Sequence, residues 1–149
     1  MREILFRGKR ADNGKWIVGS LLHVKVIPQG DCYLIFGPNF GWDDPGELHA
    51  KKHAVVAPET VGQYTGLRDK NNRRIFEGDI VNIGDSESGI EIYARVQWLP
   101  NGPCLRDRET DCFAPFNSVN FSQNAPRYWA VIGNIYDNPE LLGGDVCGD

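Results

Sequence analysis

Glycine and proline recur along the whole chain, at intervals that leave few windows long enough for an α-helix. The 149 residues include 17 glycines and 9 prolines. Glycine and proline at this frequency favour short strands joined by turns. With 41% hydrophobic and 24% charged residues, the chain can bury enough apolar surface to fold without a metal or a disulfide. The sequence therefore predicts a mainly β fold (β-dominated α+β) with one or two short helical turns.

The clearest strand signal lies in residues 90–98, where apolar and polar side chains alternate. A period of two over nine residues is typical of an antiparallel strand with one buried face. We expect Ile92 and Val96 to lie in the core and Glu91 and Gln97 to face water.

Other segments predict further strands. Asp12-Asn13-Gly14 predicts the turn of a hairpin over about residues 2–22, since Asn-Gly tolerates left-handed backbone. Strands are also expected at 32–36, at 74–83 with a break at Gly78, and at 128–135. Helical turns are expected to start at Asp44-Pro45-Gly46-Glu47 and at Asn138-Pro139-Glu140.

These elements predict two interleaved small antiparallel sheet or barrel-like lobes. The lobes would cover about residues 1–65 and 66–142, and the second resembles SH3-like barrels in pattern. Residues 143–149 are glycine-rich with little to pack against, so we expect a flexible tail there.

The charge is divided unevenly between the two halves. Residues 1–65 hold eight basic and seven acidic side chains, and residues 66–149 hold eight basic and thirteen acidic ones. This balance argues against a protein whose main affinity comes from neutralising phosphates. We expect a cytoplasmic protein without a membrane segment, because neither a signal-peptide pattern nor a long apolar run occurs. In that compartment the four cysteines, at positions 32, 104, 112 and 147, would stay reduced.

Three stretches together resemble the YopX family. They are residues 2–8 with 13–16, residues 59–71 with 75–81, and residues 131–142. The resemblance spans residues 1–142 as a single domain and implies a β-rich protein borne by phages and prophages, without an assigned activity. One departure is visible: Lys70-Asn71-Asn72 stands where the family usually has Lys-Asn-Gly. Because asparagine also adopts left-handed backbone, we expect the turn to persist at some conformational cost.

Several patterns that suggest catalysis or metal binding are incomplete. His49 and His53 have the spacing of a zinc protease but lack the glutamate after the first histidine. Cys104 and Cys112 are separated by seven residues, too many for a zinc knuckle. The segment Gly84-Asp85-Ser86 does not continue into the nucleophile elbow of serine hydrolases. We therefore expect no catalytic residue, no metal and no cofactor.

A carboxylate cluster offers the best enzyme candidate. Asp107, Glu109 and Asp111 could bind magnesium for phosphodiester cleavage. Arg106 and Arg108 alternate with them, however, which favours an exposed loop of mixed charge.

The densest basic run, residues 68–74, holds four cations and one anion beside two aromatic residues. Such a tip could follow a nucleic-acid backbone, although a solvated turn fits the acidic remainder of the chain better. The candidate interaction surface consists of Tyr64, Arg68, Asp69, Lys70, Arg73, Arg74 and Phe76.

The function favoured by these observations is a non-enzymatic protein-binding or assembly module of phage or prophage. Its partner would be a phage or host protein, and a homo-oligomer is possible. A nucleic-acid-binding accessory protein using the 68–74 tip is the first alternative, and steep salt dependence of DNA binding would favour it. The second is a small metal-dependent nuclease, which magnesium-dependent cleavage lost in Asp111→Ala would favour.

Overall fold

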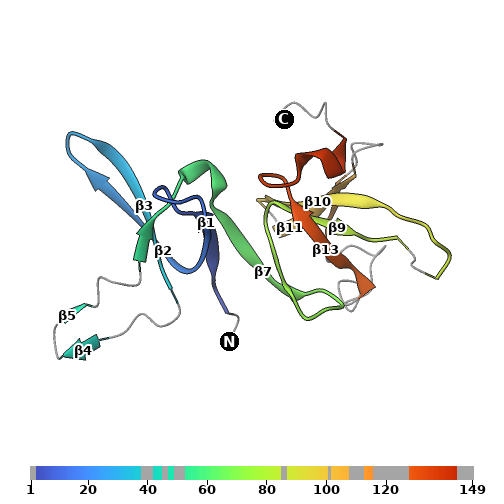
Figure 1. Ribbon diagram of the computed structural model, residues 1–149, viewed down its shortest axis with the longest axis horizontal. Helices are drawn as coiled ribbons and strands as arrows, with labels where there is room; N and C mark the ends of the chain where they lie inside the picture. The colour runs from blue at the N-terminus through green and yellow to red at the C-terminus, as the bar shows by residue number, and fades with distance from the viewer. Residues whose placement is uncertain are drawn as a thin grey trace. The chain divides into compact units, whose positions relative to one another are not determined.

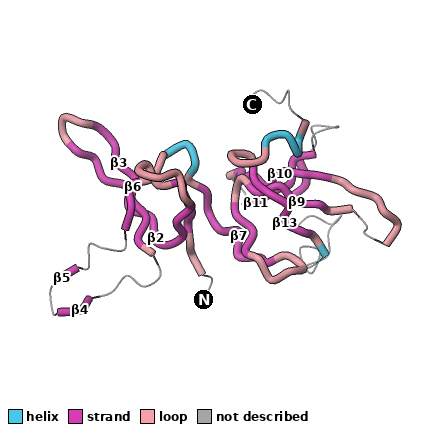
Figure 2. The backbone as a smooth tube through the Cα atoms, viewed as in Figure 1, coloured by secondary structure: helices cyan, strands magenta, loops and turns pink. Residues whose placement is uncertain are grey.

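The structure is a computed structural model and is dominated by antiparallel strands, with short 3-10 helices at Pro58–Thr60 and Pro139–Leu142 (Figures 1 and 2). It describes residues 3–37, 42–44, 47–48, 53–84, 87–100, 102–107, 113–115 and 128–143. The predicted mainly β class is confirmed. The chain divides into two compact units, residues 1–64 and 65–149. Beyond Gly143, the expected tail lies outside the described residues.

The first unit is built on strands hydrogen-bonded in the order β6-β3-β2-β1. Their bounds are β1 Phe6–Lys9, β2 Trp16–Val26, β3 Gly30–Phe36 and β6 His53–Val55. The start of β7 (Gly62–Arg68) pairs with β1, where Phe6 faces Gln63. The predicted hairpin over residues 2–22 is confirmed, and Gly14 has a positive φ of 70° in its turn.

The strand register divides the side chains of this unit between two faces. Leu21, Ile35 and Ala54 lie opposite one another on the inner face, where Ile35 is fully buried. An isolated bridge from Arg10 to Val56 brings the end of β1 to the end of β6.

The prediction of a helical turn starting at residue 44 is wrong. Instead β4 (Trp42–Asp44) pairs antiparallel with β5 (Glu47–Leu48), and Asp44 faces Glu47. The intervening Pro-Gly sequence suits a β-turn as well as a helix start, so the local signal was ambiguous. Further on, β6 extends through Val55, in keeping with the β preference of branched side chains.

The second unit is a five-stranded antiparallel sheet together with the hairpin formed by the end of β7 and β8. The sheet order is β12-β11-β10-β9-β13. The bounds are β8 Arg74–Phe76, β9 Asp79–Asn82, β10 Tyr93–Leu99, β11 Gly102–Asp107, β12 Phe113–Pro115 and β13 Ala130–Asn134. The break predicted at Gly78 is confirmed. Among the described strands both large sheets are open, so the barrel-like and SH3-like character expected from the sequence is not confirmed.

The core of the second unit is a cluster of apolar side chains that are at most 4% exposed. Its members are Ile75, Val81, Ala94, Val96, Leu105 and Trp129. The alternation predicted for 90–98 holds only within β10, because Ile90 and Ile92 are 54% and 41% exposed. Pairing with β9 starts at Tyr93 opposite Asn82, so both isoleucines precede the paired part of the strand.

The two positions on this segment predict different effects on stability. Val96→Ala should lower the free energy of unfolding by roughly 1–3 kcal/mol, because it deletes fully buried methyl groups. Ile92→Ala removes an exposed side chain and should change the free energy by less than about 0.5 kcal/mol. Urea denaturation of both variants measures the difference, and equal losses would contradict this placement of the core.

Candidate functional site

A buried aspartate forms the base of the basic tip between β7 and β8. Asp69 is 4% exposed. Its Oδ1 accepts the backbone N–H groups of Asn71 (2.9 Å) and Arg73 (2.8 Å), and its Oδ2 accepts the N–H of Val131 (2.9 Å). The carboxylate therefore closes the turn and ties it to β13.

Backbone bonds complete this turn. The N–H of Asp69 donates to the Arg73 carbonyl at 2.8 Å, and the N–H of Asn72 donates to the Asp69 carbonyl at 3.0 Å. Asn72 has a φ of 63°, which confirms the left-handed conformation expected for the residue in the glycine position. The Arg68 guanidinium donates to the Asn72 carbonyl at 2.9 Å. The tip is thus a fixed structure.

The seven residues of the predicted interaction surface separate into two groups. Arg68, Lys70 and Arg73 are exposed on the turn, and Arg74 is half-buried. The rings of Tyr64 and Phe76 are each 5% exposed, and Tyr64 belongs to the first unit. With Asp69 also buried, the structure brings together three exposed cations, while both aromatic residues of the predicted surface are buried. Tyr128 is 75% exposed and precedes Trp129, whose carbonyl accepts the N–H of Lys70 at 2.9 Å.

The turn between β8 and β9 is held by a second buried aspartate. Asp79 is 1% exposed, and its Oδ2 accepts the N–H of Phe76 at 2.8 Å. Gly78 adopts a positive φ of 91°. The N–H of Gly78 donates to the Val96 carbonyl, and the Gly78 carbonyl accepts the N–H of Ile135, both at 2.9 Å. This carboxylate too is occupied by the backbone of its own unit.

Two asparagines organise the turn after β13. Asn134 Oδ1 accepts the N–H groups of Tyr136 (3.0 Å) and Asp137 (2.9 Å). Asn138 Oδ1 accepts the N–H of Asn134 at 3.3 Å. A Cβ on Gly133 would lie 2.5 Å from that oxygen, so the close approach requires glycine. The helical turn predicted at 138–140 is confirmed at Pro139–Leu142, although the Asn138 side chain does not cap it.

Four polar side chains in the stretches that resemble the YopX family therefore bind backbone groups: Asp69, Asp79, Asn134 and Asn138. Sequence reasoning assigned Asp69 to an interaction surface and missed this role. An aspartate two residues before a turn asparagine is a signal for such a local bond. The bond to Val131 has no local signal, because the two residues are 62 positions apart.

Only some residues of the other patterns considered in the sequence lie in the described part of the chain. His53 lies in strand β6, where its ring centroid is 5.2 Å from that of Phe36. Cys104 is 1% exposed, and its burial raises the pKa of the thiol, with the nearby Glu77 charge adding to the effect. Asp107 ends β11. The predicted partners His49, Cys112, Glu109 and Asp111 lie outside the described residues, as do Asp85 and Ser86.

Two kinds of feature are absent from the described residues. No group of three or more histidine, cysteine, aspartate or glutamate side chains could hold a metal ion there. No helix in that part of the chain has the length and apolarity needed to cross a membrane.

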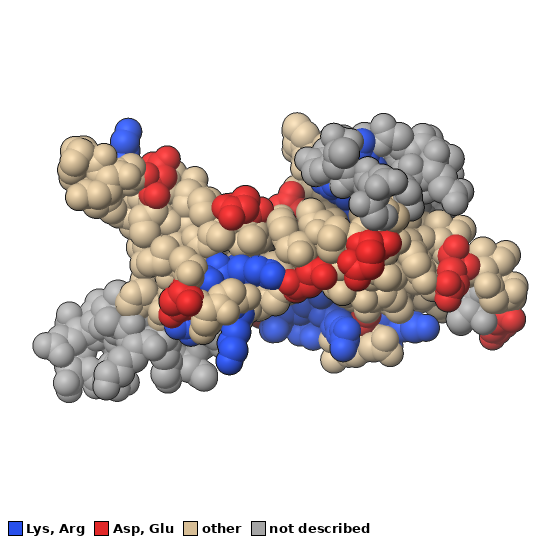
Figure 3. Space-filling view, turned by 45° about the horizontal axis from the view of Figure 1, so that its top comes forward, with Lys and Arg blue, Asp and Glu red and all other residues tan. Residues whose placement is uncertain are grey.

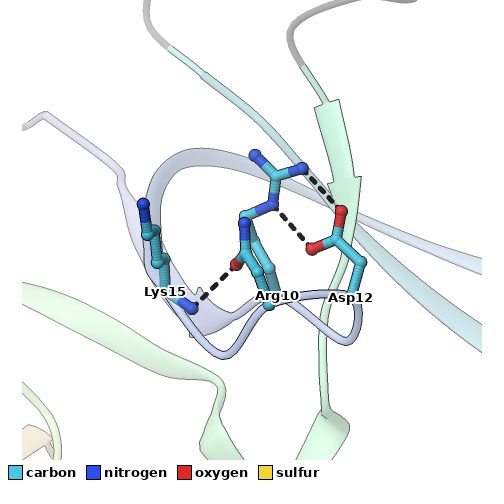
Figure 4. A network of polar contacts seen from close by, with 4 residues as sticks. Arg10, Asp12 and Lys15 are labelled. Carbon is cyan, nitrogen blue, oxygen red and sulfur yellow. Dashed lines mark hydrogen bonds and ion pairs between the residues drawn. The ribbon is translucent and has the colours of Figure 1, made fainter.

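A charged pair at the β1–β2 turn is a further polar feature (Figure 4). The Arg10 guanidinium donates from Nε to Asp12 Oδ1 at 3.0 Å and from Nη2 to Oδ2 at 2.7 Å. These bonds hold the pKa of the Asp12 carboxyl below its usual value. Because both side chains are solvent-accessible, we interpret the pair as a surface ion pair.

The feature that sequence reasoning missed is an apolar patch on the outer side of the first unit, which we call the apolar face. Leu22, Leu34 and Val55 lie opposite one another on β2, β3 and β6, and Val24 lies opposite Cys32. Leu22 and Val55 are each 46% exposed and Val26 is 41% exposed. The apolar face comprises Leu22, Val24, Val26, Cys32, Leu34 and Val55. Alternation at 22, 24 and 26 was visible in the sequence, but it could not indicate that this side stays uncovered.

The structural role of Asp69 predicts a large loss of stability on its removal. Asp69→Ala leaves three backbone donors without their acceptor and should lower the free energy of unfolding by about 3 kcal/mol. Arg73→Ala is the matched control, since it keeps the bonded N–H and removes an exposed side chain; it should cost less than about 0.5 kcal/mol. Thermal and urea unfolding measure both variants. Similar losses from the two would show that the carboxylate does not fasten the turn.

Comparison with known proteins agrees with this architecture. The family model described as YopX protein matches residues 5–143. The crystal structure of protein EF1440 from Enterococcus faecalis matches with a TM-score of 0.61 at 22% identity, covering 95% of this chain and 99% of that one. At this identity the match shows a shared fold. No curated protein matches the sequence. Because the family model covers nearly the whole chain, the protein belongs to the YopX family.

Proposed function

We propose that the protein is a non-enzymatic binding and assembly module, borne by a phage or prophage and active in the bacterial cytosol. It binds a phage or host protein through the apolar face of its first unit. No cofactor takes part in this function.

The observation that carries the proposal is the exposure of the apolar face. Leu22, Val26 and Val55 are each more than 40% exposed on one side of a regular sheet. Contiguous apolar surface of this kind typically marks a binding site. Burial of apolar area contributes roughly 25 cal/mol per Å², so a matching protein surface would gain affinity from this face without ion pairs.

The use of the buried polar groups supports a role without catalysis. Asp69 and Asp79 accept backbone N–H groups at 2.8–2.9 Å. An acid, base or metal ligand needs a carboxylate that can reach a substrate or an ion. These two carboxylates instead accept hydrogen bonds that hold turns in place.

A nucleic-acid interface at the tip is the alternative with some structural support. Arg68, Lys70 and Arg73 project from a fixed turn, as a phosphate-binding tip would require. Against it, residues 65–149 hold thirteen acidic and eight basic side chains. Tyr64 and Phe76 are buried, although Tyr128 is exposed. Figure 3 shows acidic side chains close beside basic ones. We therefore favour a protein partner.

One comparison of three proteins tests the proposal. Tagged wild-type protein, a Leu22→Ser/Val55→Ser variant and a Lys70→Ala/Arg73→Ala variant are recovered from lysogenic cells together with what they bind. We expect the wild type and the tip variant to retain the same protein partner and the face variant to lose it, because only the face variant loses apolar contact area.

Titration with DNA and RNA completes the comparison. We expect weak binding that is unchanged in the Lys70→Ala/Arg73→Ala variant. The contrary result would be sub-micromolar binding by the wild type that the variant greatly weakens, with the slope of log binding constant against log salt concentration flatter by about two units. That result would replace the protein-binding function with the nucleic-acid one.

A further inference from the structure

We infer that the apolar face binds a second copy of this chain, face against face about a two-fold axis. The inference rests on the proposed function and names the partner of that same surface. A surface that pairs with itself must be complementary to itself in shape and charge. Both requirements can be examined in the first unit.

The shape requirement is met by a regular sheet surface. The register of β2 with β3 runs without interruption from Ser20 opposite Phe36 to Val26 opposite Gly30. β6 pairs with β3 only from Leu34 to Phe36, so the far part of the hairpin is two-stranded (Figure 1). Sheets of this kind stack about 10 Å apart, with side chains from the two inner faces interdigitating. Leucine and valine at alternate positions supply such side chains.

The charge requirement is met because the apolar face carries no ionisable group other than the Cys32 thiol. The charged residues of the hairpin occupy the alternate positions and so the opposite side. There the His23 ring stacks on Tyr33 with centroids 4.4 Å apart, and His23 Nε2 lies 3.2 Å from Asp31 Oδ1. The side chains of His23 and Asp31 are 51% and 55% exposed. The far part of the hairpin thus has one polar and one apolar side, and a face-to-face dimer would bury only the apolar one.

The distribution of charge along the chain also favours contact through the first unit. Residues 1–64 hold eight basic and seven acidic side chains, whereas residues 65–149 hold eight and thirteen. Two copies approaching through the first unit meet almost no net repulsion, and two copies approaching through the second unit would repel each other.

The size of the apolar face sets the expected affinity. A standard interface involves about 20–30 residues on each side, and the six side chains of the apolar face with their rim make a smaller one. We therefore expect a reversible dimer with a dissociation constant on the order of micromolar. Added salt should change this constant little, because the contact is uncharged.

Sedimentation velocity over a wide concentration range tests the inference. The wild type should shift from monomer to dimer as its concentration rises, and Leu22→Ser/Val55→Ser should stay monomeric. Ile90→Ser is the matched control, since Ile90 is a comparably exposed isoleucine at 54% in the second unit; it should dimerise like the wild type. Val26→Lys at the end of β2 is an additional variant, should the double substitution fail to fold. It would place a charge among the apolar side chains of the other copy, which is costly without a partner charge, and should keep the protein monomeric.

The thiol of Cys32 provides a second readout in the unmodified protein. Cys32 lies on the apolar face, is partly exposed and is unpaired. Its alkylation rate, followed on its own peptide by mass spectrometry, should fall as the wild-type concentration rises and stay constant in Leu22→Ser/Val55→Ser.

The outcomes separate this inference from the proposed function. A wild-type protein that stays monomeric at every concentration, with a constant Cys32 alkylation rate, would overturn the second-copy inference. Suppose that the wild type stays monomeric but captures another protein from lysogenic cells, and that Leu22→Ser/Val55→Ser does not capture it. The binding function then stands, with that protein as the partner. If the face variant loses no captured protein, both the inference and the proposed function fail.

Discussion

Three backbone N–H groups share the carboxylate of one buried residue, Asp69, and the second unit depends on this arrangement. Two of the donors belong to the turn after β7, and the third, Val131, lies in β13, 62 positions later. A carboxylate removed from water is costly unless such bonds compensate for it. Charge-assisted bonds to backbone donors are the stronger kind, at about 1.5–3 kcal/mol each. The carboxylate therefore fixes a local turn and a long-range contact together.

The same principle recurs along the path of the chain. β13 pairs with β9, β9 starts at the turn that Asp79 closes, and β13 ends at the turn that Asn134 and Asn138 close. Each of these side chains lies in a stretch that carries the family resemblance. At these positions the resemblance reflects the requirements of the fold, whereas the apolar face that we propose for binding lies on the first unit. This division supports a protein that acts by binding.

Local signals in the sequence predicted much of the fold. The Asn13-Gly14 turn, the break at Gly78 and the left-handed Asn72 are properties of a few adjacent residues, and all are present in the structure. Membership of the YopX family was likewise visible in contiguous stretches and is confirmed.

The errors and omissions concern features that pairing partners decide. Ile92 continues the alternation of β10 but precedes its paired part and is exposed. Pro45-Gly46 fits a helix start and a β-turn equally, and the partner of β4 is β5. The apolar face is defined by the register of three strands, and no local pattern shows which side of a sheet remains uncovered.

Amide hydrogen exchange at Val131 and Arg73 tests the role of Asp69 most directly. If the carboxylate fastens β13 to the tip, both amides should exchange only through global unfolding, with the same free energy of opening as the core of the second unit. The amide of Lys15 is the internal reference, since it is bonded to the exposed Asn13 side chain at 2.9 Å and should exchange through local opening. Exchange of Val131 and Arg73 at a rate near that of Lys15 would contradict the account.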